Sequence, residues 1–181
     1  MMVTPHFREL RWSDWDFCRA LAADPSVRAV SLNRRPPTRW GHARWMWSWM
    51  TGRDRRAWII ERRALVIGRY LVGNERVDGP LGRVGLLRAA RLPGGGCEVS
   101  IALLEAARGR GLGTVTLSAM TSVIHSVLGG PVYARIRLDN VFSLSAFLKA
   151  GFVMARGPEW ERVSEGQHGV YVLRWPSEEV H

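Results

Sequence analysis

Cysteine and lysine are nearly absent from this sequence, and long apolar runs are missing. Cys18 and Cys97 are its only cysteines and belong to no CxxC or Cys/His cluster, so we expect no disulfide and no metal site. No apolar run reaches the roughly 18 residues that a membrane helix needs. The start, MMVTPHFREL, lacks the basic-then-apolar layout of a signal peptide. We therefore expect a cytoplasmic protein without a membrane partner.

Positive charge comes almost entirely from arginine, because Lys149 is the single lysine in a chain of net charge +10. Such an excess favours anionic partners in general. The arginines are scattered rather than clustered, so nucleic-acid binding is disfavoured. With 181 residues, of which 46% are apolar, the chain suits one soluble domain over residues 1–181.

The apolar patterns and turn signals predict an α/β chain with a mixed sheet. We expect strands over residues 7–11, 57–61, 65–72, 81–88, 97–104, 132–138, 152–155 and 170–175. We expect helices from Ser13 to about Ala23, over 41–50 and 114–128, and from Asn140 or Ser143 to Gly151. Loops are expected over 74–80 and 92–96. An antiparallel meander thus precedes a strand, helix, strand, helix, strand section.

The stretch EAARGRGLGT, residues 105–114, packs three glycines between a strand and a helix. A P-loop would need a Lys followed by Ser or Thr after the last glycine, and none is present. A dinucleotide fingerprint would need a third glycine where Thr114 stands. Uncovered amides beside a helix N-terminus instead predict an anion cradle, to which Arg108 and Arg110 add charge. The alternative is a glycine-rich connection that holds no ligand.

Here the sequence resembles the GCN5-related N-acetyltransferase (GNAT) family. Arg108, Gly111 and Gly113 match its signature of Arg or Gln, two residues, Gly, one residue, and Gly or Ala. A second family element, with the pattern N..S.....K.GF, follows one helix and one strand later. It is matched by Asn140, Ser143, Phe147, Lys149, Gly151 and Phe152. The resemblance covers about residues 7–175 and is strongest over 98–152.

The resemblance implies a splayed, mostly antiparallel central sheet flanked by helices, with acetyl-CoA in a cleft between strands 97–104 and 132–138. Its pyrophosphate would lie on the amides of the glycine stretch, and its pantetheine arm would pair with the first of these strands. The implied cofactor-binding residues are Ile101, Ala102, Leu103, Arg108, Gly109, Arg110, Gly111, Leu112, Gly113, Thr114, Asn140, Ser143, Phe147 and Lys149.

The resemblance also implies catalytic groups. Glu98 occupies the place of a carboxylate that acts as base directly or through water, and strand alternation puts Ser100 on the same face. An amide within 101–103 would stabilise the oxyanion. Phe147 stands where many members carry a Tyr proposed to protonate the leaving thiolate. Either the thiolate leaves without a protein acid, or Ser145 or water serves, or the domain binds acyl-CoA without turnover.

An aromatic segment, WGHARWMWSWM over 40–50, predicts a helix that is apolar nearly all round and must be covered. It either plugs the core or a homodimer seam, or lines the acceptor site with His42, Trp45 and Trp49. With DPSVRAVS and EVSIAL, it resembles family members that acetylate nucleotide-linked amino sugars. An amino acid, a peptide N-terminus and an amine antibiotic remain alternative acceptors of this small-molecule amine class.

Overall fold

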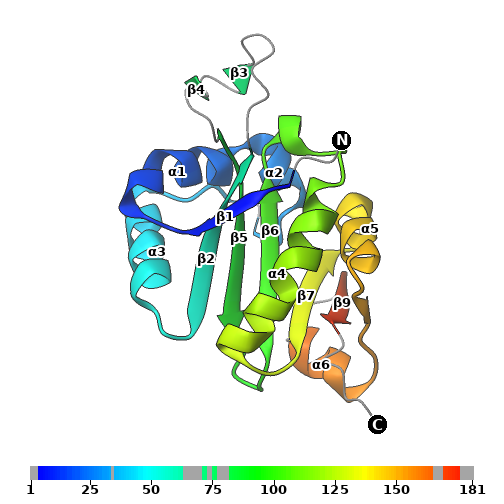
Figure 1. The fold of residues 1–181 in the computed structure, drawn as a ribbon. Helices are drawn as coiled ribbons and strands as arrows, with labels where there is room; N and C mark the ends of the chain where they lie inside the picture. Colours follow the sequence, from blue (N-terminus) through cyan, green and yellow to red (C-terminus); the bar gives the residue numbers. More distant parts are fainter. Residues whose placement is uncertain are drawn as a thin grey trace.

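The computed structural model describes residues 4–33, 35–62, 71–72, 75–76, 82–164 and 169–175. A seven-stranded sheet has the order β1-β2-β5-β6-β7-β9-β8, and β3 and β4 pair separately (Figure 1). The strands are β1 (His6–Glu9), β2 (Arg55–Arg62), β3 (Leu71–Val72), β4 (Glu75–Arg76), β5 (Gly82–Arg91), β6 (Cys97–Leu103), β7 (Val132–Arg137), β8 (Val153–Met154) and β9 (Val170–Trp175). The expected strand over 65–72 and loop over 74–80 lie mostly outside the described residues.

The helices follow the expected order with two additions. They are α1 (Trp15–Ala23), α2 (Pro25–Val30), α3 (Arg39–Thr51), α4 (Leu112–Leu128), α5 (Val141–Lys149) and α6 (Pro158–Ser164), with 3₁₀ turns η1 (Trp12–Asp14) and η2 (Glu105–Ala107). Neither α2 nor α6 was predicted from the sequence. Asp24 begins α2 by accepting hydrogen bonds from the N–H groups of Ser26 and Val27, and Pro25 takes the first helical position.

Two apolar clusters lie on opposite faces of the sheet. The larger one joins α4 and α5 to alternate residues of the central strands, among them Leu87, Val99 and Ala134. The second joins α1, α2 and α3 to the other face, where Leu86 and Ala102 contribute. Figure 1 shows α4 crossing the front of the sheet, with α1 and α3 beside β2. This second face therefore carries the even-numbered residues of β6, including Glu98 and Ser100.

The sheet opens between β6 and β7, as the family resemblance implies. The two strands are parallel neighbours at only two residue pairs, Cys97↔Val132 and Glu98↔Tyr133. On its other side β6 pairs with β5 antiparallel along its whole length. Beyond Glu98, no strand pairs with the edge of β6 that faces β7.

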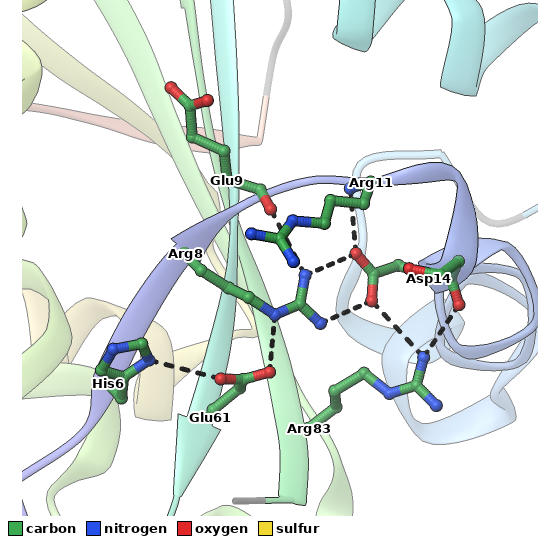
Figure 2. A network of polar contacts seen from close by, with 8 residues as sticks. His6, Arg8, Glu9, Arg11, Asp14, Glu61 and Arg83 are labelled. Atoms are coloured by element: carbon green, nitrogen blue, oxygen red, sulfur yellow. Dashed lines mark hydrogen bonds and ion pairs between the residues drawn. The ribbon is translucent and has the colours of Figure 1, made fainter.

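An ionic network ties the N-terminal strand to the sheet (Figure 2). The guanidinium of Arg8 donates to both carboxylate oxygens of Asp14, at 2.7 Å each, and to Glu61 at 2.7 Å. The backbone N–H of Arg11 also donates to Asp14, at 2.9 Å, and Arg83 approaches the same carboxylate at 3.4 Å. Asp14 is fully buried. A buried carboxylate needs such partners, because burial without them costs several kcal/mol.

The network controls the ionisation of Asp14. Burial by itself would raise the pKa of this carboxyl, but the hydrogen bonds from Arg8 and the Arg11 amide, with the charges of Arg8 and Arg83, hold the pKa below its ordinary value. A carboxyl with a depressed folded-state pKa stabilises the fold above its ordinary pKa of about 3.9, and this contribution is lost as the pH falls further.

Replacement of Asp14 by Asn is expected to lower the free energy of unfolding at pH 7 by about 3 kcal/mol, since it leaves Arg8 short of a charge partner. Urea titration from pH 7 to pH 3 should show a shallower loss of stability below pH 4 in the variant than in the wild type. Asp16→Asn, at an exposed acid in the first turn of α1, should cost less than about 1 kcal/mol. Equal costs for the two variants would contradict this account of the network.

Candidate active site

The glycine stretch forms an uncovered turn between β6 and α4. Gly109 and Gly111 have φ angles of 72° and 75°, in the left-handed region that other residues avoid. Both residues are exposed, and a Cβ built on either one would meet no atom within 4 Å. The space above this backbone is thus free for a ligand to approach closely.

The first turn of α4 points four unpaired amides toward the same space. Gly111 is the N-cap, and no side chain caps the helix. Its carbonyl accepts the first intrahelical hydrogen bond, from the N–H of Val115 at 3.0 Å. By helix geometry the N–H groups of Gly111, Leu112, Gly113 and Thr114 have no intrahelical acceptor. The 17-residue helix adds the positive end of its dipole, so this terminus suits an anion.

The two arginines of the glycine stretch differ in role. Arg108 turns back toward the sheet, and its Nε donates to the carbonyl of Leu103 at 3.0 Å. Its side chain therefore braces the end of β6. Arg110 is exposed beside the glycines, where it adds positive charge.

The unpaired edge of β6 offers backbone groups to the opening in the sheet. The N–H of Leu104 donates to Val84 of β5, whereas the N–H of Cys97 donates to Pro131 on the β7 side. Because backbone groups alternate in direction along a strand, Ile101 and Leu103 direct theirs to the β7 side, and Ala102 directs its own to β5. Of the three residues predicted here, Ile101 presents both of its backbone groups to the opening, and Leu103 presents its N–H, because its carbonyl already accepts a hydrogen bond from Arg108.

Glu98 and Ser100 lie on the face of β6 opposite α4, as alternation predicted. Both oxygens of Glu98 accept hydrogen bonds from Arg135 of β7, at 2.9 Å from Nε and 2.7 Å from Nη2. This bidentate ion pair spans the last point where β6 and β7 are neighbours, and its side chains are only 12% and 20% exposed. Arg135 was not predicted from the sequence, and no local signal identifies it, since it lies 37 residues from Glu98.

The start of α5 lies next to α2. The side-chain oxygen of Asn140 accepts a hydrogen bond from the N–H of Ser143 at 3.1 Å, so Asn140 is the N-cap. Its Nδ2 donates to the carbonyl of Val30 at 3.4 Å. Lys149 is exposed in the last turn of α5, at the opposite end of the helix from Asn140. The structure therefore does not bring these two predicted cofactor residues together.

Phe147 lies inside the core. It is 2% exposed and meets Phe152 edge to face, with ring centroids 4.9 Å apart at 79°. Ser145, the alternative hydroxyl on this helix, is exposed. Phe147 belongs to the apolar cluster of α4 and α5, against which Ile101 and Leu103 of β6 also pack.

His42 differs from its predicted role. It is 1% exposed, and its Nε2 lies 3.3 Å from the carbonyl oxygen of Trp15. Its ring packs against Trp15 and stacks on Trp45 at 5.4 Å. Burial lowers the pKa of this imidazole, which keeps it neutral. His42 is therefore a core residue that cannot touch an acceptor in this structure.

The α3 helix, which was expected to be apolar nearly all round and to be covered, is covered on one face only within this chain. Met46 is fully buried against the sheet, whereas Trp40 and Trp47 are 87% and 62% exposed. Trp45 and Trp49 are half-buried between these faces, with ring centroids 6.0 Å apart. Arg88 of β5 lies over both rings, at 5.8 and 5.6 Å from their centroids. Since Arg88 pairs with Ser100 in the sheet register, these tryptophans border the same face as Glu98.

Two surface hollows of about 300 Å³ lie elsewhere, one against β9 and α6 and one at the Gly95–Gly130 turns. Neither includes the glycine stretch or Glu98. The candidate site is thus an open strand edge and an exposed turn rather than an enclosed cavity. Among the described residues, no cluster of His, Cys, Asp or Glu could hold a metal ion, and no helix is both long and apolar enough to span a bilayer.

Comparisons with known proteins agree with this architecture. A model of the Acetyltransferase (GNAT) domain matches residues 6–153. A domain from Methanocaldococcus jannaschii has a TM-score of 0.72 at 19% identity and covers 96% of this chain and 98% of its own. Spermidine N-acetyltransferase from Vibrio cholerae, solved with CoA and spermine, has a TM-score of 0.66 at 14% identity, covering 94% and 93%.

A third solved structure is the aminoglycoside acetyltransferase AAC(6′)-Ib with coenzyme A, with a TM-score of 0.64 at 14% identity, covering 94% of this chain and 92% of its own. Comparison with curated proteins gave no match. The predicted fold class is confirmed, and the amino-sugar subgroup stays a prediction. Since the family model spans most of the chain, the glycine turn and the open edge of β6 belong to a member of the GNAT acetyltransferase family.

Proposed function

We propose that the protein transfers an acetyl group from acetyl-CoA to the primary amine of a small molecule. The observation that carries this proposal is the juxtaposition of the bare turn at Gly109–Gly111 with the unpaired edge of β6. The turn and the first amides of α4 suit a diphosphate, and a strand edge suits an extended amide-containing arm. A GNAT domain match and neighbours crystallised with CoA support the same cosubstrate.

The residues divide the binding of acetyl-CoA among them. The amides of Gly111, Leu112, Gly113 and Thr114 would take the diphosphate, with Arg110 alongside. The carbonyl of Ile101 and the N–H of Leu103 would pair with the pantetheine arm, and Asn140 and Ser143, at the start of α5, would contact the same arm. Bound acetyl-CoA supplies an activated thioester, whose carbonyl is open to attack by an amine.

The groups proposed to act in acetyl transfer lie on the sheet face that carries Glu98. Arg135 holds the Glu98 carboxylate at the mouth of the sheet opening. The remaining lone pairs of the Glu98 carboxylate can accept a hydrogen bond from the incoming amine. The carboxylate can then take the proton of the amine, directly or through water. Ser100 lies beside it on the same face, and the N–H of Ile101 is the donor offered to the developing oxyanion. With no hydroxyl at Phe147, the thiolate leaves as such, since a thiol pKa of about 8.5 makes it a tolerable leaving group.

The acceptor is proposed to be a small-molecule amine, with nucleotide-linked amino sugars, amino acids, peptide N-termini and antibiotics as candidates. Structural neighbours include enzymes named for spermidine and for aminoglycosides. Trp45 and Trp49 border the proposed acceptor face. His42 is buried and is therefore not part of the proposed acceptor site. The cytoplasm stays the proposed location. A homodimer through the exposed tryptophans of α3 stays a prediction.

A thiol-release assay tests the proposal. Acetyl-CoA is incubated with pooled amines from each acceptor class, and free CoA is measured. Release that depends on both enzyme and amine, with the acetylated amine found by mass spectrometry, is the expected result. CoA binding without release from any pool would contradict catalysis and favour the second candidate, a non-catalytic acyl-CoA-binding module. The observation that favours this second candidate is the buried, hydroxyl-free Phe147.

A further inference from the structure

Arg88 stands out among the charged residues of the sheet because the structure gives it aromatic partners and no acid. It is half-buried on the face shared with Glu98 and Ser100. Its guanidinium lies over the rings of Trp45 and Trp49, within the 6 Å range of a cation–π contact. Within residues 4–33, 35–62, 82–164 and 169–175 it forms no hydrogen bond or ion pair with a carboxylate.

A second arginine, Arg28, acts on Arg88 through its charge. Arg28 of α2 donates through Nη1 to the carbonyl of Asn33 at 2.8 Å, but its Nε is buried without a hydrogen-bond partner among the described residues. Burial lowers the pKa of both arginines, and the positive charge of Arg28 lowers that of Arg88 further. A guanidinium nonetheless stays protonated in proteins. Two half-buried positive charges thus act on one another, and neither forms an ion pair with an acid among the described residues.

The acid nearest to this pair is already engaged. Among the groups whose charge acts on Arg88, Glu98 is the only carboxylate, and both of its oxygens accept hydrogen bonds from Arg135. Strands β5 and β7 therefore contribute Arg88 and Arg135 to this face and α2 contributes Arg28, whereas Glu98 is the one carboxylate whose charge acts on Arg88. Such a face repels a polycation and attracts an anion.

Stacking leaves the hydrogen-bonding edge of Arg88 available. A guanidinium contacts aromatic rings through its flat face, while its N–H groups point outward in the fork that matches a carboxylate or a phosphate. Trp45 and Trp49 also fix the orientation of the side chain, which reduces the entropy lost on binding. Arg88 pairs with Ser100, so its backbone lies one strand spacing, about 4.8 Å, from the strand that carries Glu98.

We propose that the acceptor is an amine that also carries a carboxylate or phosphate group, and that Arg88, with Arg28, binds this anionic group while Glu98 receives the amine. This inference rests on the proposed function and names its substrate class. Polyamines and other polycationic amines are then poor acceptors. Because Arg88 lies one strand away from β6, the acceptor is expected to be compact. Its anionic group and its amine should be only a few bonds apart.

Matched amine pairs test this inference. Methionine is compared with methioninamide, glucosamine 6-phosphate with glucosamine, and spermidine serves as the polycation. We expect kcat/KM for the anionic member of at least one pair to exceed that of its neutral partner by about 10-fold or more, mainly through KM. The carboxylate and phosphate arms show which anion is preferred. Equal or faster acetylation of the neutral amines or of spermidine would overturn the inference.

Variants of Arg88 and Arg55 distinguish recognition of the anionic group from stacking on the tryptophan rings. Arg88→Gln should remove most of the preference for the anionic amine, with the Kd for CoA unchanged, and Arg88→Lys should restore part of it. Arg55→Gln is the matched control, because Arg55 also lies over Trp49, at 5.7 Å, but is paired with Asp54. The selectivity of the control should equal that of the wild type. Identical losses for anionic and neutral amines in Arg88→Gln would contradict a role in anion recognition.

A separate binding experiment distinguishes failure of this inference from failure of the proposed function. If no amine releases thiol, the proposed transferase activity fails, and calorimetry with methionine and glucosamine 6-phosphate in the presence of CoA measures anion recognition by itself. Binding that Arg88→Gln abolishes would support the inference even then. Absence of binding to both probes would overturn it.

Discussion

Replacement of Gly111 by Asp is expected to weaken coenzyme A binding by roughly 5-fold to 1,000-fold. The repulsion between two negative charges 4 Å apart costs about 1 kcal/mol in water and about 4 kcal/mol at lower dielectric. Gly111 is exposed with a φ of 75°, and a Cβ there meets no atom of the protein. Asp tolerates this conformation and is a good N-cap, so the fold should survive. Its carboxylate would occupy the space proposed for the diphosphate.

The matched control is Gly111→Asn, which has nearly the same size, the same tolerance of the left-handed region and no charge. Calorimetry with CoA should give a much smaller loss for Asn than for Asp, with similar melting temperatures for both variants. Equal losses would mean that side-chain bulk alone matters. Unchanged affinity in both variants would remove the diphosphate from this turn.

Replacement of Glu98 by Gln should lower turnover about 100-fold, the usual contribution of a general base, while the Kd for CoA changes little. The carboxylate faces the acceptor side, whereas the diphosphate is proposed to lie beyond the end of β6. Gln keeps the shape and one acceptor oxygen toward Arg135 but cannot take a proton. The measurement is kcat and KM with the best amine, together with calorimetry of CoA.

Glu161→Gln provides the control, since Glu161 is an exposed acid on α6 and should leave kcat unchanged. The pH profile separates catalysis from structure: loss of the base should change the dependence of kcat/KM on pH, which a merely destabilised variant would not do. A Glu98→Gln enzyme with full turnover would show that the amine loses its proton to solvent alone.

Local patterns were enough to predict the structural elements that are proposed to bind CoA. The left-handed glycines, the start of α4 and the N-cap at Asn140 each depend on residues within a few positions of one another. The same kind of signal was present for α2, where Asp24 precedes Pro25, and for α6, where Gly157 precedes Pro158. Those two helices were missed although their boundaries are visible in the sequence.

The acceptor side depends on contacts between distant residues, which no local pattern contains. Arg135 meets Glu98 only because β6 and β7 are neighbours at their first residues. His42 was predicted at the acceptor from its helical spacing to Trp45, but the packing of α1 against α3 places it under Trp15. The stacking of Arg88 on α3 likewise follows from the order of strands in the sheet.

Isothermal titration of the wild-type protein with coenzyme A and with pantetheine, which lacks the diphosphate, tests the central claim most directly. The account predicts one CoA per chain, bound at least about 10-fold more tightly than pantetheine, with Gly111→Asp reducing the affinity for CoA alone. No association with CoA, or equal affinity for the two compounds, would contradict the claim that the backbone of the β6–α4 turn binds a diphosphate.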